Sequence, residues 1–190
     1  MLLLRAYLLA GLVIHKLVWA RLKRQAGGPF HPPGPVPLRV RLIKLVKMAI
    51  LGAIAVQTVF PGYWLPLATA PGTLEAIGVC VFSAGLALAI AGRVQLGDNW
   101  SDIETARILP AQAVVQHGVY RYVRHPIYIG DLLLLLGLEL ALNSWLVLGV
   151  VALTPFVLAK AIREEEMLKA SLPGYREYCQ ASKRFIPFVV

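Results

Sequence analysis

Charged side chains are scarce in this chain. Only 15% of its 190 residues are Asp, Glu, Lys or Arg, whereas 58% are hydrophobic. Soluble domains usually carry about 25% charged residues. The shortage of charge therefore excludes an ordinary soluble domain and predicts an integral membrane protein.

Acidic residues are the rarer charged type. The chain has 10 Asp and Glu residues against 19 Lys and Arg residues, which gives a net charge of +9. Such a balance could indicate nucleic-acid binding, but the sequence shows no motif of combined aromatic and basic residues for that purpose. The basic residues instead gather in alternate loops, as they do in membrane proteins. We expect the bilayer as a partner and no nucleic acid.

Cysteine is nearly absent as well. Cys80 lies in an apolar run and Cys179 lies in the polar C-terminal tail. Two cysteines in these places do not indicate a disulfide framework, and nothing around them suggests a metal site. We therefore predict that the protein holds no metal.

Apolar sequence, by contrast, is abundant. A membrane-crossing helix needs about 20 predominantly apolar residues, and five stretches meet or approach that length: 2–20, 42–60, 74–92, 127–142 and 145–162. The first stretch lacks a small-residue cleavage site, which predicts a retained anchor rather than a removed signal peptide. The expected fold class is all-α, a polytopic membrane protein with about five transmembrane helices.

The last two stretches are separated only by Asn143 and Ser144. They must therefore form an antiparallel helical hairpin, and they are short enough to be tilted or to cross the membrane incompletely. We expect one membrane domain over residues 1–190, with three spans in 1–92 and the hairpin 127–162 in the second half.

The remaining segments connect these spans. Residues 25–37 contain several Gly and Pro residues and predict a loop. Residues 61–73 lack Lys and Arg and carry Tyr63 and Trp64, which predicts an outer hairpin with an aromatic anchor. Residues 93–124 predict a connector at the inner interface, and interfacial helices follow the hairpin.

A dense polar run, residues 118–130, precedes the fourth stretch. It holds three tyrosines, two arginines and a histidine. Pro126 suits the first turn of a helix, where its missing N–H would have no helical partner. The N–H groups and the positive dipole end of that helix would then lie beside Arg124 and His125, which favours an anion at this place.

A second polar cluster ends the fifth stretch. It consists of Lys160, Arg163, Glu164, Glu165 and Glu166. Because the fourth and fifth stretches form a hairpin, this cluster and the run 118–130 must be neighbours. The sequence therefore predicts a polar pocket mouth at the boundary between water and lipid.

Two acids lie within the fourth stretch. Asp131 and Glu139 are eight residues apart, which places them on similar faces of a helix and about 12 Å apart along its axis. Ionisable groups at membrane depth indicate function by default. We expect Asp131 to line the pocket, whereas Glu139 fits a substrate contact or a hydrogen-bonded packing residue.

These motifs, taken in order, resemble a known family. They are Gly118-x-Tyr120-x-x-x-Arg124-His125-Pro126-x-Tyr128-x-Gly130, then Glu164-Glu165-x-x-Leu168, Tyr175-x-x-Tyr178 and Arg184-Phe185-Ile186-Pro187, with Leu96-Gly97-Asp98-Asn99-Trp100-Ser101 upstream. The pattern is similar to that of the isoprenylcysteine carboxyl methyltransferases and of the wider group of phospholipid methyltransferases. The resemblance covers about residues 96–187.

The resemblance implies S-adenosylmethionine as methyl donor, bound on the cytoplasmic side by the half 93–190. By position, the implied cofactor contacts are Gln112, Ala113, Val114, Val115, Tyr120, His125, Pro126, Ile127 and Tyr128, with one acidic contact at Glu164 or Glu165. Arg124 and these two glutamates are the implied catalytic groups. Arg124 and Lys160 would handle a carboxylate or polar head of the acceptor. Independently of the resemblance, the depth of Asp131 and Glu139 on the fourth stretch makes them expected substrate residues.

The chain departs from the family pattern at two places. Gln112 stands where a histidine is common, and Leu172-Pro173-Gly174 replaces a frequent Phe-Gly. The first departure concerns a cofactor contact and the second concerns the acceptor. An isoprenylcysteine-type carboxylate therefore competes with a phospholipid amine, a thiol or another lipophilic acceptor.

Functions of other classes have less support. A transporter would show inverted repeats or paired broken helices, and neither occurs here. A haem-bearing electron carrier would need facing histidines inside spans, whereas only His15 lies within one. A non-enzymatic transporter or scaffold remains the alternative.

The distribution of basic residues tests the predicted topology. Seven of the 19 Lys and Arg residues lie between Arg21 and Lys47, four between Arg93 and Arg124, and six from Lys160 onward. With Lys16 near the inner end of the first span, 18 of the 19 fall on one side of a five-span arrangement. By the positive-inside rule, the N-terminus lies outside and the C-terminus is cytoplasmic.

A reporter that is active only in the cytoplasm should accordingly be active when it is fused to the C-terminus. The same reporter placed within residues 61–73 should give the opposite result and serves as the control. A clear external signal from the C-terminal fusion would overturn the five-span topology.

Overall fold

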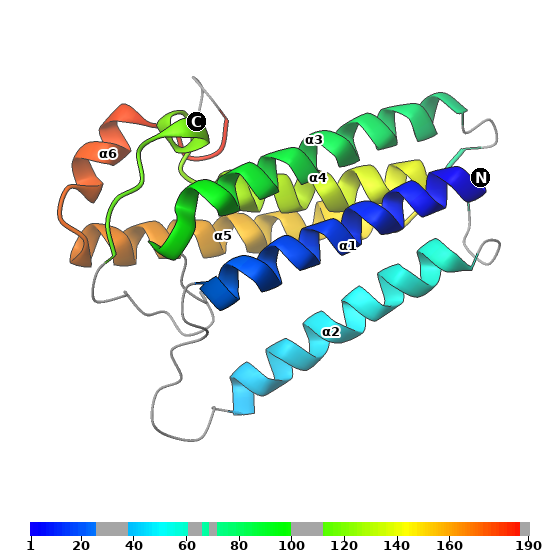
Figure 1. Ribbon diagram of the computed structural model, residues 1–190, viewed down its shortest axis with the longest axis horizontal. Helices are drawn as coiled ribbons and strands as arrows, with labels where there is room; N and C mark the ends of the chain where they lie inside the picture. Colours follow the sequence, from blue (N-terminus) through cyan, green and yellow to red (C-terminus); the bar gives the residue numbers. More distant parts are fainter. Residues whose placement is uncertain (26–37, 61–65, 69–71, 100–111, 187–190) are drawn as a thin grey trace. The chain divides into compact units, whose positions relative to one another are not determined.

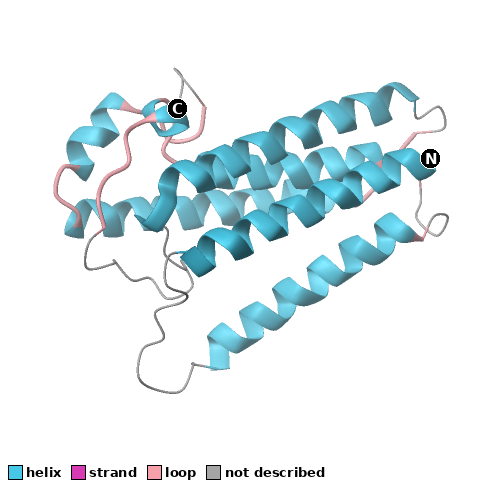
Figure 2. Cartoon of the chain, in the orientation of Figure 1, coloured by secondary structure: helices cyan, strands magenta, loops and turns pink. Residues whose placement is uncertain are grey.

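The computed structural model describes residues 1–25, 38–60, 66–68, 72–99 and 112–186 (Figures 1 and 2). Helices dominate these residues, and their β-structure is limited to two isolated bridges. The chain divides into two compact units, Met1–Leu65 and Pro66–Val190, which are described separately. The helical fold predicted from the sequence is confirmed.

The first unit contains α1 (Leu2–Gln25) and α2 (Leu38–Val59). Both helices are long and apolar enough to cross a membrane. The Arg5 guanidinium donates hydrogen bonds to the backbone carbonyls of Gln57 and Thr58, at 3.3 and 2.8 Å. A cation at this position satisfies carbonyl groups that the last turn of α2 leaves without helical partners.

The second unit contains α3 (Gly72–Leu96), α4 (Pro126–Ala141), α5 (Val147–Ser171) and α6 (Tyr175–Ala181), with the 3-10 turns η1 (Gly97–Asn99) and η3 (Gly118–Arg121). Among the described residues, a stretch of α3 and η1 is the third candidate membrane span. The 16 residues of α4 rise only about 24 Å, which is short for a hydrocarbon core of about 30 Å.

The predicted hairpin is present, formed by α4 and α5. Its turn is held by Asn143, which adopts a positive φ of 53°, a conformation that Asn tolerates better than most residues. The Asn143 side-chain amide exchanges two hydrogen bonds with the backbone of Ala68, at 2.9 and 2.8 Å. The Asn143 backbone carbonyl accepts a third from the Leu67 backbone amide. The turn is therefore fixed to the segment that precedes α3.

Glycines allow α3 and α4 to pack backbone against backbone. Three glycines of α3 and two of α4 recur every seven residues, a repeat typical of helices that cross at a shallow angle. The facing pairs run antiparallel: Gly78 with Ala141, Phe82 with Gly137, Gly85 with Leu134, Ala89 with Gly130 and Gly92 with Ile127. Small residues at such a seam let membrane helices approach closely.

This seam groups α3 with the C-terminal half of the chain. The sequence predicted one membrane domain over residues 1–190, with the third span counted among the three spans of its N-terminal part, 1–92. In the structure the second unit begins at Pro66 and includes α3. The reason is the glycine seam, because it joins α3 to α4 across the whole connector that separates them in sequence.

Replacing Gly137 by Ala should destabilise the protein. The new methyl group would overlap the backbone of Phe82, and such overpacking typically costs about 1–3 kcal/mol. We expect a lower midpoint of thermal unfolding in detergent.

Gly149→Ala is the matched control, because among the described residues no atom other than those of its own helix backbone and chain neighbours lies within 4 Å of the position that its Cβ would take. Alanine favours helix over glycine by about 1 kcal/mol, so this variant should be as stable as the parent or more so. Equal midpoints for the two variants would contradict the close packing of α3 and α4.

Candidate functional site

The start of the polar run 118–130 contacts the C-terminal end of α3. The Val119 amide donates to the Gln95 side chain at 2.7 Å, and the Ala113 amide donates to the Asn99 side chain at 2.6 Å. Gly118 packs against Gln95 with a positive φ of 59°, a conformation suited to glycine. Both ends of the described segment 112–121 are therefore anchored near the same turn.

The C-terminal tail returns to this run. The Arg124 amide donates to the Lys183 carbonyl at 2.8 Å, and the Lys183 amide donates to the Tyr122 carbonyl at 3.0 Å. The Tyr178 hydroxyl donates to the Tyr120 carbonyl at 2.7 Å. Two segments about 60 positions apart thus share one short parallel bridge.

The Glu165 carboxylate is at the centre of an ion cluster. It is fully buried, with 0% of its side chain exposed. Its Oε1 accepts from Arg124 Nε at 2.8 Å and contacts His125 Nε2 at 3.1 Å, while its Oε2 accepts from Arg184 at 3.0 and 2.9 Å. Because a carboxylate only accepts hydrogen bonds, the His125 contact requires a hydrogen on Nε2.

This cluster keeps Glu165 ionised. Burial alone would raise its pKa, but the hydrogen bonds from His125, Arg184 and Arg124 outweigh burial and hold the pKa well below its usual range. The bond to Glu165 in turn raises the pKa of Arg184. Buried charges persist where they are paired and hydrogen-bonded in this way.

The three adjacent glutamates have three different surroundings. Glu164 lines a pocket and accepts a hydrogen bond from the Tyr128 hydroxyl at 3.0 Å. Glu165 is buried in the ion cluster. Glu166 is 66% exposed and pairs with Lys169 at 2.9 Å. The acidic residue that reaches the pocket is therefore Glu164.

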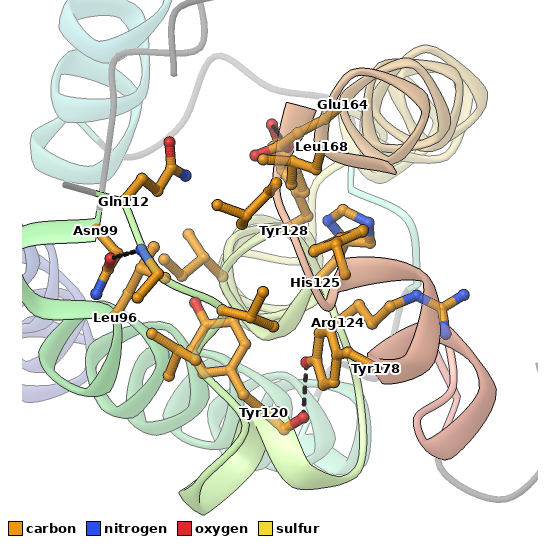
Figure 3. A pocket seen from close by; sticks show the side chains of 16 residues that line it. Leu96, Asn99, Gln112, Tyr120, Arg124, His125, Tyr128, Glu164, Leu168 and Tyr178 are labelled. Carbon is orange, nitrogen blue, oxygen red and sulfur yellow. Dashed lines mark hydrogen bonds between the residues drawn. The ribbon is translucent and has the colours of Figure 1, made fainter. Parts of the chain in front are cut away.

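The pocket lies between the end of α3, the run 112–128, the polar part of α5 and α6 (Figure 3). Its polar lining comes from Asn99, Gln112, Tyr120, Arg124, His125, Tyr128, Glu164, Tyr175 and Tyr178, and its apolar lining from Leu96, Ala113, Val114, Val115, Ile127, Leu168 and Leu172. One carboxylate, several hydroxyls and amides and broad apolar walls suit an amphiphilic ligand.

The pocket tyrosines outside the membrane helices stay protonated. Burial raises the pKa of Tyr178 to about 12. Burial also raises the pKa of Tyr120 and of Tyr175, and nearby groups such as Tyr178 and Glu165 add to these shifts. These hydroxyls are therefore hydrogen-bond donors at physiological pH rather than bases.

An apolar groove adjoins the pocket. It runs between α4 and α5 and is lined by Tyr128, Ile129, Leu132, Leu133, Leu136, Val150, Val151, Thr154, Leu158, Phe185 and Ile186. Tyr128 lines both the groove and the pocket. The two spaces therefore meet at this side chain.

Most of the implied cofactor contacts line the pocket. These are Gln112, Ala113, Val114, Val115, Tyr120, His125, Ile127, Tyr128 and Glu164. Pro126 instead packs against Gly92, and Glu165 lies behind the wall in the ion cluster. Their roles in binding remain predictions.

The predicted substrate residues are placed differently. Asp131, Glu139 and Lys160 do not line the pocket or the groove, and Glu139 is buried. Arg124 reaches the pocket wall, but its guanidinium turns away toward Glu165 and the carbonyls of Cys179 and Ser182 (Figure 3). This geometry favours a structural part for Arg124 over contact with an acceptor.

Several lining residues were not singled out as site residues from the sequence. Leu96, Asn99, Tyr175 and Tyr178 belong to motifs that carried the family resemblance, and they line the pocket. Arg184, which belongs to another of these motifs, completes the ion cluster. The ordering of these motifs was the signal that could have identified them. Among the described residues, no group of His, Cys, Asp or Glu could hold a metal ion.

The family model for phospholipid methyltransferase matches residues 74–172, which is more than half of the chain. The protein belongs to this family. The resemblance inferred from the motifs is confirmed, and the match also includes nearly all of α3, of which the motifs reached only Leu96.

Two relatives are more specific. The chain is 29% identical over 119 residues to the protein-S-isoprenylcysteine O-methyltransferase of Tribolium castaneum, covering 61% of this chain and 42% of the relative. The solved structure of a eukaryotic intramembrane Ras methyltransferase, an isoprenylcysteine carboxyl methyltransferase, matches with a TM-score of 0.57 and 25% identity.

That structural match covers 81% of this chain and 55% of the solved chain. The protein therefore has the fold of a polytopic helical membrane protein, as predicted from its composition. The chain spans about half the length of the relatives that it matches.

Glu165→Gln should destabilise the protein strongly. The substitution removes the charge that neutralises Arg124 and Arg184, and breaking a buried ion pair typically costs about 3–5 kcal/mol. We expect a large drop in the free energy of unfolding, whereas Glu166→Gln at the exposed neighbouring position should change it little.

The pH dependence provides a second measure. Because the pKa of Glu165 is lowered in the folded state, its stabilising contribution is present above the unfolded pKa of about 4.3 and is lost as the pH falls below that value. Acid unfolding should accordingly be less steep in Glu165→Gln than in Glu166→Gln. Superimposable acid profiles would show that the cluster does not control stability.

Proposed function

We propose that this protein is an S-adenosylmethionine-dependent methyltransferase that acts on a lipophilic or amphiphilic acceptor in the membrane. The observation that carries the proposal is the pocket on the family motifs, which meets an apolar groove at Tyr128. Membership of the phospholipid methyltransferase family supports the same reaction class.

The residues of the pocket suit the cofactor. S-adenosylmethionine carries an ammonium, a carboxylate, a ribose and an adenine, and when bound it supplies an electrophilic methyl group. Glu164 offers an acceptor for the ammonium, whereas His125 and the protonated Tyr120 offer polar groups for the oxygens. Val114, Val115 and Leu168 form apolar walls suited to the adenine and the thioether.

The chain's contribution to catalysis would be positioning. Methyl transfer is an in-line displacement, so the rate depends on alignment and on exclusion of water. The Tyr128–Glu164 hydrogen bond joins the start of α4 to α5 where the pocket and the groove adjoin. A rigid contact at this place would hold the reacting groups close together.

The acceptor would lie with its hydrocarbon part in the groove and its reactive end at Tyr128. The groove is lined almost entirely by apolar side chains of α4 and α5. The tyrosines of the pocket are donors rather than bases, which favours an acceptor that is already deprotonated. An isoprenylcysteine-type carboxylate meets this condition, and the Tribolium relative is named for that reaction.

A phospholipid amine is the second candidate acceptor. The name of the family supports it. An amine must be deprotonated before transfer, and among the described pocket residues His125 is of the type that most often serves as a general base. For either acceptor we propose that the cofactor site is cytoplasmic, in agreement with the distribution of basic residues.

Purified protein in detergent should bind S-adenosylhomocysteine saturably at one site. Glu164→Gln should weaken binding about 10- to 100-fold, because loss of a charged hydrogen-bond partner costs about 1.5–3 kcal/mol. Calorimetric titration measures both affinities.

Glu166→Gln is the control, since this exposed side chain lies on the same helix and pairs only with Lys169 in the described contacts. It should bind like the parent protein. Folded parent protein that does not bind S-adenosylhomocysteine would refute the proposed cofactor. An S-farnesylated cysteine derivative and phosphatidylethanolamine then test the two acceptor classes.

A further inference from the structure

Residues 183–186, here called the strap, cross the site from the C-terminal tail. Lys183 pairs through its backbone with Tyr122 and Arg124. Arg184 binds the buried Glu165, and the Phe185 ring lies 5.6 Å from the His125 ring, centroid to centroid. Lys183, Arg184 and Phe185 therefore each contact either residues 122–125 or Glu165, the carboxylate that binds Arg124 and His125.

Arg184 fixes the orientation of the Glu165 carboxylate. Both hydrogen bonds to Oε2 come from Arg184, while Oε1 binds Arg124 and His125. Rotation of the carboxylate is restricted because Arg184 holds one oxygen while Arg124 and His125 hold the other. The fixed Oε1 then holds His125 Nε2, and the same histidine ring lines the pocket.

Phe185 lies where pocket and groove meet. It lines the groove together with Tyr128. His125, which lines the pocket, is 5.5 Å from the Tyr128 ring and 5.6 Å from the Phe185 ring. Three aromatic rings contributed by the polar run and the strap thus surround the junction.

The strap is also the outermost part of the ion cluster. The Arg184 side chain is 30% exposed, compared with 8% for Arg124 and 0% for Glu165. If Arg184 left, Glu165 would still have Arg124 and His125 as partners. Loss of Arg184 would therefore leave the Glu165 charge paired through Oε1.

We propose that the strap is a clasp that closes the junction between pocket and groove, and that Arg184 is a positioning residue that holds His125 through Glu165. The proposal rests on the methyltransferase function argued above. The closed clasp excludes water from the place where the acceptor would meet the cofactor, and it keeps the imidazole oriented toward the pocket.

Hydrogen–deuterium exchange of the full-length protein tests the clasp directly. In Arg184→Ala, the amides of Arg124 and Lys183 should exchange faster, because both are hydrogen-bonded across the bridge that the strap forms. Peptides from α3 and α4 should exchange as in the parent protein, which verifies the fold. Arg176→Ala removes a comparable charge from an exposed position of α6 and should change neither region.

Binding of S-adenosylhomocysteine tests the positioning role. Arg184→Ala should lower the affinity about tenfold, by analogy with metal sites, where loss of the partner that orients a ligand side chain costs about 10- to 100-fold. Arg184→Lys keeps the charge and should restore part of the affinity, a rescue not expected from a general loss of structure. Arg176→Ala should bind like the parent protein.

The outcomes separate the two proposals. Unchanged exchange of the strap in Arg184→Ala would refute the clasp, whether or not any ligand binds. Normal binding by Arg184→Ala, or equal losses for Arg184→Ala and Arg184→Lys, would refute the positioning role. If the parent protein itself fails to bind, the proposed function falls and the positioning role with it, while the exchange data still decide the clasp.

Discussion

The buried charge of Glu165 is the constraint on which the site depends. A carboxylate without water is costly unless it is paired and fully hydrogen-bonded, and here the partners come from two distant segments, at Arg124 and His125 and at Arg184. Arg124 extends the cluster by donating to the carbonyls of Cys179 and Ser182. The ion cluster therefore attaches the C-terminal tail to the start of α4.

A second constraint acts inside the membrane, where apolar burial does little to favour contact between helices. The glycine repeats of α3 and α4 let their backbones approach along five successive pairs. This seam brings Gly92 against the first turn of α4, beside Pro126 and Ile127. The end of α3 and the beginning of α4 are consequently neighbours, and the pocket is built where they meet.

These two constraints together create a site with one polar and one apolar side. The pocket has Glu164 and protonated tyrosines in its wall, whereas the groove between α4 and α5 is almost wholly apolar. Tyr128 belongs to both and is held by Glu164. Such a division suits a reaction between a polar cofactor and a membrane-dissolved acceptor, since neither molecule has to leave its own solvent completely.

The sequence by itself determined the helical membrane class, the positions of the apolar helices, the α4–α5 hairpin and the family, because composition, apolar run length and motif order do not depend on packing. Only the tertiary structure decided which of three adjacent glutamates reaches the pocket and that the Arg124 guanidinium turns away from it. It also decided that α3 packs with α4. Neighbouring residues on a helix differ by about 100° in direction, and the rotation of α5 is set by contacts with distant segments that the sequence does not specify.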